Sequence, residues 1–270
     1  MKQIAITALC CLLATTANAQ KGGGKGGDSQ TPQVAAQAKA AGPGPKTKAE
    51  AAAVSDLLKA IAAGPAQTVE AADNLVTKFP KSDYKSFALY QEADAYQQKG
   101  DMAKAQVFAE QALAADPKNY DADVLIANVV AMSTKDSDFD KEDKLKQVDK
   151  YAHEALEMVD GPPGPDLFVM TADIRTRKKN EAISKAWQAL GTAALVRKNV
   201  NEAVEDFEKG VEANPDPYLI IRAGRALIAA KKYDDAITYY DKVLNSADAD
   251  AQAKQIATSD KARATAAKGH

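Results

Sequence analysis

The sequence predicts an all-α protein built from stacked antiparallel helix pairs, and three observations support this fold class. Alanine dominates the composition, and aromatic residues make up only 6% of the 270 residues, which is typical of helical proteins. From Glu50 onward apolar residues recur every three or four positions, and no segment alternates long enough to form a strand. Gly, Asn, Asp and Pro fall between these periodic segments and predict the turns.

The chain begins with the features of an export signal. Lys2 gives a positive start, residues 4–13 form an apolar run, and Ala17-Asn18-Ala19 has the small-x-small pattern of a signal-peptidase site. The run is too short for a transmembrane segment, which needs about 20 apolar residues. We therefore expect a signal peptide over residues 1–19, cleavage after Ala19, and a periplasmic or secreted protein that starts at Gln20.

Both cysteines, Cys10 and Cys11, lie inside this signal. One alternative is lipidation of either cysteine, but Leu9 occupies a position that normally takes Gly or Ala, and the apolar run continues past both. A cytoplasmic N-terminal helix is the other alternative, and it is disfavoured because a surface helix should not be apolar all round. Without a cysteine the mature chain forms no disulfide, so its helices must be held by packing.

Residues 20–48 are predicted to be a disordered linker. A glycine tract over residues 21–27 and the sequence Gly42-Pro43-Gly44-Pro45 disfavour both helix and strand. Five lysines accompany a single acid, Asp28, in this segment. These are Lys21, Lys25, Lys39, Lys46 and Lys48. We expect the linker to act as a spacer, with a weak contact to an anionic envelope surface as the alternative.

A repeated pattern organises the helical part of the chain and is clearest over residues 184–215. Two large residues, a glycine and a small residue are followed by a small residue, an aromatic residue, a glycine and a proline: Trp187, Leu190, Gly191, Ala194, Ala203, Phe207, Gly210 and Pro215. Gly191 would let a partner helix approach closely. The pattern resembles the tetratricopeptide repeat, W-x2-L-G-x2-Y followed by A-x3-F and P, with Ala194 in place of the tyrosine. The resemblance implies a right-handed alpha-solenoid.

Two further copies of this pattern cover residues 86–117 and 217–246. Their matching residues are Leu89, Ala93, Tyr96, Ala105, Ala109, Ala112 and Pro117, and then Ile220, Gly224, Leu227, Ala236, Tyr240 and Val243. In the first of them, Glu92 stands where an apolar residue is usual. Lys99-Gly100-Asp101 predicts a helix stop followed by an N-cap, and Lys198-Asn199 does so less strongly.

Degenerate units over residues 50–79 and 120–159 complete a repeat domain of about five helix pairs over residues 50–246. The first unit is broken at Gly64-Pro65. The second carries an insertion within residues 132–142. Val130 and Val148 are 18 positions apart, whereas the equivalent residues of the best repeat, Ala194 and Ala203, are nine positions apart.

The C-terminal part of the chain is expected to start with a long helix from Asp166 to about Lys198, which leads into the best repeat. The alanine-rich residues 248–270 are expected to form a capping helix that frays, since the end of a solenoid needs a polar outer face.

Residue types that serve catalysis and metal binding are scarce. Of the two histidines, His270 is the last residue, and His153 is predicted to face solvent. The absence of a mature cysteine and of a histidine pair disfavours a zinc site, and a nucleophilic triad would have only His153 to use. A net charge of −2 disfavours broad nucleic-acid binding, which needs a strongly basic face. We expect no enzymatic activity, no cofactor and no metal.

Two charged segments have alternative interpretations. Asp136, Asp138 and Asp140 alternate as in a calcium loop, but that loop needs a glycine at position 6 and a glutamate at position 12, where this chain has Lys141 and Gln147. We therefore expect a solvated acidic loop. The basic residues within 175–179 should point to more than one helix face, which favours a solvated surface over contact with an anionic partner.

The resemblance also implies a binding face. Tetratricopeptide proteins bind extended peptides or partner helices on a concave face that is lined mostly by the first helix of each repeat. By resemblance the lining comprises Phe87, Tyr90, Asp94, Gln97, Lys185, Gln188, Thr192, Leu195, Tyr218, Ile221, Arg225 and Ile228, of which we expect about half to be exposed. The Lys/Asn/Arg clamp of chaperone-binding members is absent, since the corresponding places hold Tyr90, Asp94, Val124 and Asn128.

These features predict a non-enzymatic scaffold of the bacterial cell envelope that binds a protein or peptide partner. Residues 79–84, with Phe79, Pro80, Ser82 and Tyr84, resemble envelope tetratricopeptide proteins of outer-membrane assembly and cell-division coordination. The alternative is a passive structural or ligand-carrying envelope protein whose cationic linker contacts the wall or the membrane surface.

Overall fold

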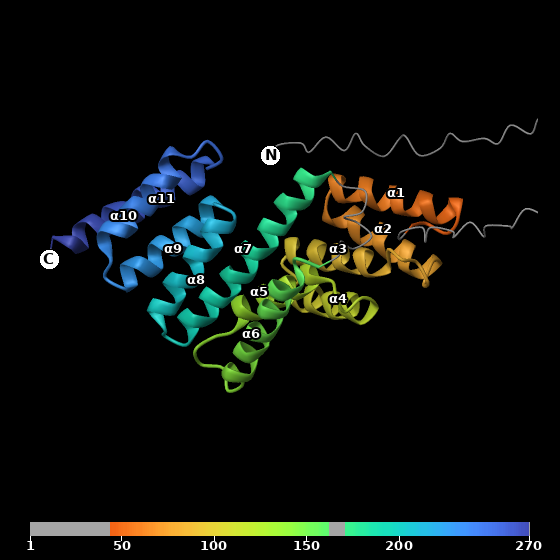
Figure 1. Ribbon diagram of the computed structural model, residues 1–270, viewed down its shortest axis with the longest axis horizontal. Coiled ribbons are helices and arrows are strands. Elements are labelled where there is room, and N and C mark those ends of the chain that lie inside the picture. The colour runs from red at the N-terminus through yellow and green to blue at the C-terminus, as the bar shows by residue number, and fades with distance from the viewer. Residues whose placement is uncertain (1–43, 162–170, 270) are drawn as a thin grey trace, which may run out of the picture. The chain divides into compact units, whose positions relative to one another are not determined.

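A computed structural model describes residues 44–161 and 171–269, and over these ranges the chain is helical with no strand (Figure 1). The first six helices are α1 (Lys48–Ala63), α2 (Pro65–Lys78), α3 (Lys85–Gln98), α4 (Met102–Ala115), α5 (Tyr120–Ser133) and α6 (Lys141–Met158). The others are α7 (Ala172–Val196), α8 (Val200–Ala213), α9 (Pro217–Ala229), α10 (Tyr233–Asn245) and α11 (Ala251–Lys268). The all-α prediction is confirmed.

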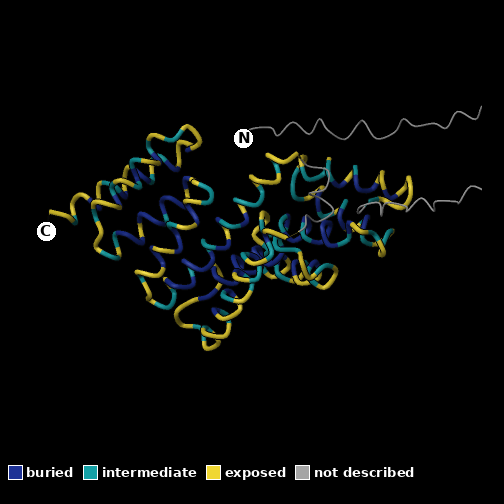
Figure 2. Tube along the Cα trace, viewed as in Figure 1, coloured by how far each residue is buried: buried dark blue, intermediate teal, exposed yellow. Residues whose placement is uncertain are grey.

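Each helix packs on the next one along the chain, so the helices form pairs from α1–α2 to α9–α10, with α11 after the last pair (Figure 1). Some first helices also touch the first helix of the next pair, as α3 does with α5 and α5 with α7, and α9 also touches the last helix, α11. Buried residues follow the facing sides of the helices (Figure 2). The predicted alpha-solenoid of about five helix pairs with a C-terminal capping helix is confirmed.

Close packing of small against large residues holds the best repeats together. A Cβ atom on Gly191 would lie 2.8 Å from two ring carbons of Phe207, and one on Gly224 would lie 2.7 Å from the ring of Tyr240. Both rings are fully buried. The glycines therefore let α7 and α9 approach the aromatic residues of α8 and α10, as the predicted pattern requires.

Turn chemistry separates the helices where the sequence predicted it. Gly64 has a φ of 134° and Pro65 takes the first position of α2, which ends α1 at the expected break. Between α3 and α4, Gly100 is left-handed with a φ of 79°, and the side chain of Asp101 accepts a 3.1 Å hydrogen bond from the backbone of Lys104.

Several boundaries differ from the predicted ones. Helix α1 starts at Lys48, inside the predicted linker, because Thr47 caps it by accepting a 3.0 Å bond from the backbone of Glu50. Lys46 is also engaged, with its Nζ 2.8 Å from Asp83. The predicted signal peptide over residues 1–19, residues 20–43 and the expected start of α7 at Asp166 lie outside the described residues. At the other end, α11 is continuous to Lys268.

The insertion forms the loop of residues 134–140 between α5 and α6, and lysines bind its acids. Asp136 lies 2.9 Å from Lys141 and 3.0 Å from Lys198, which belongs to the turn before α8. Lys144 binds both Asp138, at 3.0 Å, and Asp140, at 2.8 Å. The loop is therefore fixed by ion pairs within the chain. His153 is exposed, as predicted.

Two of the buried carboxyl groups, on α3 and α5, have strongly raised pKa values. Glu92 on α3 is 4% exposed and Asp123 on α5 is 1% exposed. Burial raises the pKa of each to about 7, and a second acid from a neighbouring helix adds to it: Asp73 beside Glu92, and Glu154 beside Asp123. One oxygen of Asp123 has no hydrogen-bond partner among the described atoms.

Candidate functional site

The twelve predicted lining residues lie on α3, α7 and α9, the first helices of three pairs, and they differ in exposure. Lys185, Leu195, Tyr218 and Arg225 are exposed, and six others are half-buried: Tyr90, Asp94, Gln97, Gln188, Thr192 and Ile228. Phe87 and Ile221, the other two, are buried. The side chains of Phe87 and Ile221 pack into hydrophobic clusters, where a partner could not reach them. Helix position alone did not indicate which residues a neighbouring helix covers.

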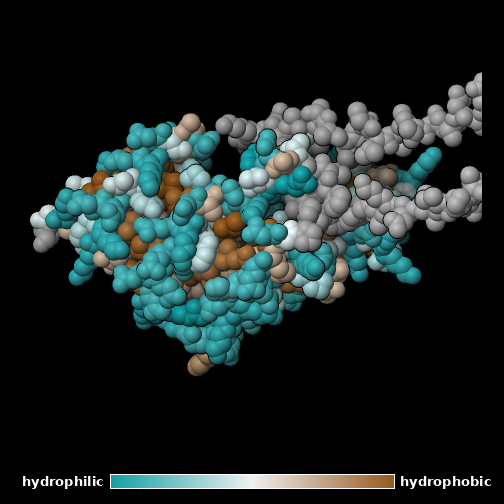
Figure 3. All heavy atoms as spheres, in the orientation of Figure 1, coloured by the Kyte–Doolittle hydropathy of each residue, from teal (hydrophilic) through white to brown (hydrophobic). Residues whose placement is uncertain are grey.

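Three of the five large apolar side chains that stay exposed in the described residues lie on first helices. Across the described ranges, the exposed ones are Val107, Met132, Phe139, Leu195 and Tyr218. Met132, Leu195 and Tyr218 lie on α5, α7 and α9, whereas Val107 is on α4 and Phe139 is in the α5–α6 loop. Hydrophobic surface shows between polar side chains in the region where α5 and α7 pack together (Figure 3).

Sequence reasoning missed Met132 because it lies in a degenerate repeat. One signal could have found it: Met132 is one helical turn after Asn128, a residue already aligned with the binding positions. We call the surface of α3, α5 and α7 that carries Tyr90, Asp94, Met132, Lys185 and Leu195 the first-helix face.

An amide network joins α5 to α7 at this face. The side-chain nitrogen of Asn128 donates to the backbone oxygens of Val124, at 2.9 Å, and Lys185, at 3.0 Å. Gln188 in turn donates to the side-chain oxygen of Asn128 at 3.2 Å. The network holds the two helices in register. It also occupies the polar groups of Asn128, which is buried.

Charged groups from three helices meet around Lys185. Burial is the largest influence on the pKa of Lys185 and opposes its charge, yet the pKa is raised because carboxylates surround the ammonium group. The acids are Glu181 on the same helix, with an oxygen 2.7 Å from Lys185 Nζ, Asp94 on α3 and Asp121 on α5. We call these four residues the Lys185 cluster. Because 49% of the Lys185 side chain is accessible, the cluster faces solvent.

The last helix engages two predicted residues of α9. The hydroxyl of Tyr218 donates to Asp250 at 3.0 Å, and this bond is the main cause that raises the pKa of Tyr218. Arg225 Nε lies 2.6 Å from a carboxylate oxygen of Asp260, which is almost fully buried. Tyr218 and Arg225 therefore hold α11 in place, a role that the sequence did not reveal.

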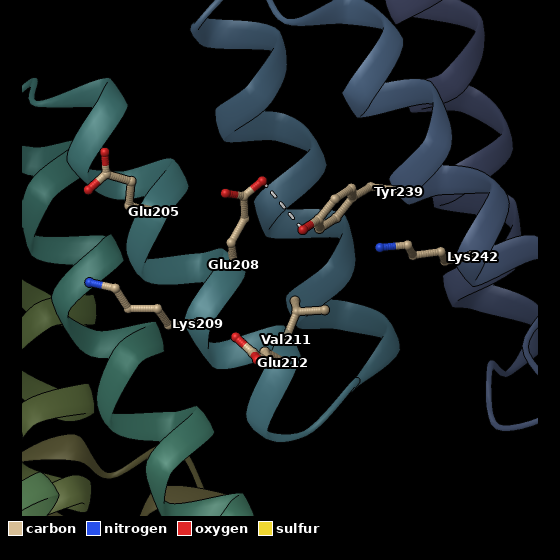
Figure 4. Close-up of a pocket in the computed structure, with 7 residues that line it drawn as sticks. All are labelled: Glu205, Glu208, Lys209, Val211, Glu212, Tyr239 and Lys242. Carbon is tan, nitrogen blue, oxygen red and sulfur yellow. Dashed lines mark hydrogen bonds between the residues drawn. The ribbon is translucent and has the colours of Figure 1, made fainter.

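The second helices carry a cleft of about 450 Å³ between α8 and α10 (Figure 4). Its lining residues are Glu205, Glu208, Lys209, Val211, Glu212, Tyr239 and Lys242. The hydroxyl of Tyr239 donates to Glu208 at 3.4 Å, and burial raises the pKa of Tyr239 to about 12. The ammonium groups of Lys209 and Lys242 lie over aromatic rings, those of Trp187 and Tyr239. The side chains of Glu208, Lys209, Tyr239 and Lys242 are therefore already engaged in interactions within the chain.

Family models of the tetratricopeptide repeat match residues 88–119, 184–217 and 219–248. These three segments are therefore similar to the tetratricopeptide repeat. The matched segments coincide with α3–α4, α7–α8 and α9–α10, the pairs in which the sequence pattern was strongest. The degenerate pairs α1–α2 and α5–α6 share the fold although these models do not match them.

Solved structures of repeat proteins are similar to this chain. A thermophilic TPR protein from Thermus thermophilus is 12% identical, with 78% of this chain and 98% of that chain covered and a TM-score of 0.57. PilF of Pseudomonas aeruginosa is 20% identical, with 68% and 88% covered and a TM-score of 0.28. The TPR2AB domain of yeast Sti1, in complex with pHSP90, is 16% identical, with 80% and 97% covered and a TM-score of 0.29. The first of these supports the fold. The search of curated proteins found no match.

Among the described helices, none is long and apolar enough to cross a membrane.

Proposed function

We propose that this protein is a non-enzymatic scaffold that binds a protein or peptide partner on its first-helix face. Met132 and Leu195 carry the proposal, because these apolar side chains stay exposed, 53% and 39%, on α5 and α7, the helices that also carry Asp121 and Lys185 of the Lys185 cluster. Apolar groups with polar residues around them mark many interaction sites. Tetratricopeptide repeats commonly serve as protein-interaction scaffolds, which supports the same conclusion.

Binding at this face needs little rearrangement. The bonds of Asn128 to Lys185 and Gln188 already fix α5 against α7. A partner that covers Met132 and Leu195 gains about 25 cal/mol for each Å² of apolar surface buried. Because the helices are ordered beforehand, little of that gain is lost to conformational entropy.

A binding titration with matched variants tests this function. A partner is captured with the full mature chain from an envelope extract, identified, purified and titrated against each variant. We expect Met132→Ala and Leu195→Ala each to weaken binding by about 1–2 kcal/mol, as at other binding hot spots. Val107→Ala is the matched control, because Val107 is 49% exposed but lies on a second helix. Equal losses from all three variants would show that the first-helix face is not the site.

We also propose that the scaffold works in the bacterial cell envelope. The apolar run and small-x-small pattern of residues 1–19 support export. Mass spectrometry of the exported protein should show a chain that begins at Gln20. A diacylated Cys10 or Cys11, or an intact Met1, would contradict this. Capture should survive removal of residues 20–43; if it does not, the linker and not the repeat domain holds the partner.

A further inference from the structure

We infer that Arg222, Arg225 and Arg263, on α9 and α11, form an anion site that holds the carboxylate of an Asp or Glu residue in a bound peptide. This inference rests on the proposed function, because the ligand is a segment of a protein partner. It adds a contact outside the first-helix face, which belongs to α3, α5 and α7. We call the three residues the arginine cluster.

A buried carboxylate holds two of the arginines together. Asp260 on α11, whose side chain is only 5% exposed, accepts a 2.6 Å bond from Arg225 Nε of α9 through one of its oxygens. Its other oxygen accepts a 3.3 Å bond from Nη1 of Arg263, which lies about one turn further along α11. The two guanidinium groups therefore lie close together where α9 meets α11, and the same acid fixes both.

Most hydrogen-bond donors of these two side chains are left for a ligand. A guanidinium group has five N–H donors, and the bonds to Asp260 occupy one nitrogen of each group. The side chains of Arg225 and Arg263 are 55% and 73% exposed, so an anion can reach them. One carboxylate cannot neutralise two cations, so the pair keeps a net positive charge.

Arg222 adds a third cation, which forms no ion pair with a described residue. It precedes Arg225 by three residues on α9, so the two side chains are neighbours on the helix surface. Arg222 is half-buried. Burial and the charge of Arg225 lower its pKa, and Asp216 only partly offsets them. A half-buried guanidinium group without a counter-ion is costly, and an anion from outside the chain would remove that cost.

The charges near the cluster favour a peptide carboxylate over a large polyanion. Asp216 caps the start of α9, and Asp250 caps the start of α11. A nucleic acid or an anionic membrane surface would bring many phosphates against these acids, in a chain whose net charge is −2. A single carboxylate avoids that repulsion, and its two oxygens match the planar fork of a guanidinium group.

Three synthetic peptides test this site by fluorescence anisotropy on the full mature chain. They share one length, one leucine pattern and an amidated C-terminus, and they carry Glu, Lys or Ser at the remaining positions. We expect the Glu peptide to bind at least tenfold more tightly than the other two and to weaken as salt is raised, since salt screens exposed charges. Arg222→Gln should weaken the Glu peptide about tenfold, because hydrogen bonds between charged groups are strong.

Arg175→Gln is the matched control, because it removes the same charge from an exposed position of α7 and should leave binding unchanged. Equal losses from both variants, or equally tight binding of the Lys or Ser peptide, would overturn the anion site. A single-stranded oligonucleotide that displaces the Glu peptide more effectively than unlabelled Glu peptide would overturn the choice of a peptide carboxylate. Circular dichroism checks folding; if Arg222→Gln does not fold, Arg222→Met replaces it.

The scaffold function is tested apart from this site. If none of the three peptides binds, the anion site is wrong, and the titration of Met132→Ala and Leu195→Ala with the captured partner decides the function. If those two variants weaken the captured partner while Arg222→Gln changes neither its binding nor that of the Glu peptide, the scaffold function stands and the anion site is wrong.

Discussion

A single hydrogen atom at position 191 determines how closely α7 and α8 can approach. A Cβ there would lie 2.8 Å from two ring carbons of Phe207, closer than nonbonded carbon atoms pack. The ring is fully buried and cannot move aside without disturbing its neighbours. Gly191→Leu should therefore lower the free energy of unfolding by about 1–3 kcal/mol or more, as overpacking does in other cores. Thermal melting followed by circular dichroism measures the change.

Ala103→Leu is the control for this prediction, because it adds a leucine at an exposed position of α4 and should change stability little. If Gly191→Leu melts like the unmodified chain, α7 and α8 do not pack through this glycine.

The buried carboxyls of α3 and α5 make stability depend on pH. Burial raises the pKa of Glu92 from 4.5 to about 7 and that of Asp123 from 3.8 to about 7. Because the folded-state pKa is the higher one, the folded protein binds protons more tightly than the unfolded chain. Glu92 and Asp123 therefore contribute their full stability below about pH 4, and this contribution is lost as the pH rises through about 7. We expect the protein to be less stable at pH 8 than at pH 5.

Glu92→Gln and Asp123→Asn test this pH dependence. Each replacement is neutral at every pH, so each variant should gain stability relative to the parent chain at pH 8 and gain none at pH 4. The gain is on the order of a few kcal/mol, from about 1.4 kcal/mol per pKa unit. Chemical denaturation at both pH values measures it. A parent chain with equal stability at pH 5 and pH 8 would show that these carboxyls titrate normally.

At the scale of helices and turns, local sequence predicted most of the fold but not every turn. Gly100 gave a clear signal, whereas Lys198 and Lys231 adopt the same left-handed conformation, with φ of 68° and 60°. Lysine seldom takes this conformation, so no local rule points to position 231. The repeat length and the packing of α9 on α10 impose the turn there.

The candidate site was harder to predict than the fold. Periodicity identified the helices, and the resemblance to the tetratricopeptide repeat placed Tyr90, Lys185 and Leu195 on the expected binding face of the first helices. It could not show that α11 would bind Tyr218 and Arg225, or that Ile221 would be buried, because both depend on contacts between distant helices. Charges that meet across α3, α5 and α7 are likewise invisible in a single sequence.

The loop between α5 and α6 should not respond to calcium. Its acids already bind Lys141, Lys144 and Lys198, and a cation would have to displace these ammonium groups. The loop also lacks the glycine and the bidentate glutamate of a calcium site. We expect neither calcium nor EDTA to shift the melting temperature. A rise of several degrees with calcium would instead identify residues 136–143 as a cation site.

At the scale of the whole repeat array, α11 closes the C-terminal end. Its buried face consists of Ala253, Ala257, Asp260 and Ala264, so it contributes few large apolar groups of its own. It packs on α10, where Tyr240 and Val243 are fully buried. The stabilising effect of α11 therefore comes mainly from what it covers, as expected of a capping helix in a repeat protein.

Removing α11 should accordingly destabilise the last pair. A chain that ends at Asn245 would expose Tyr240 and Val243, and each such side chain contributes about 1.5–3 kcal/mol when it is fully buried. We expect the free energy of unfolding to fall by roughly 2–5 kcal/mol. The truncated chain should also bind a hydrophobic dye, and its amide hydrogens should exchange first in α9 and α10. The control is Lys261→Ala, which removes only an ion pair with Asp241 and should cost less than about 1 kcal/mol. If the truncated chain keeps its melting temperature and binds no dye, α9 and α10 are stable without the cap. If Lys261→Ala costs as much as the truncation, ion pairs and not covered surface hold the end of the array.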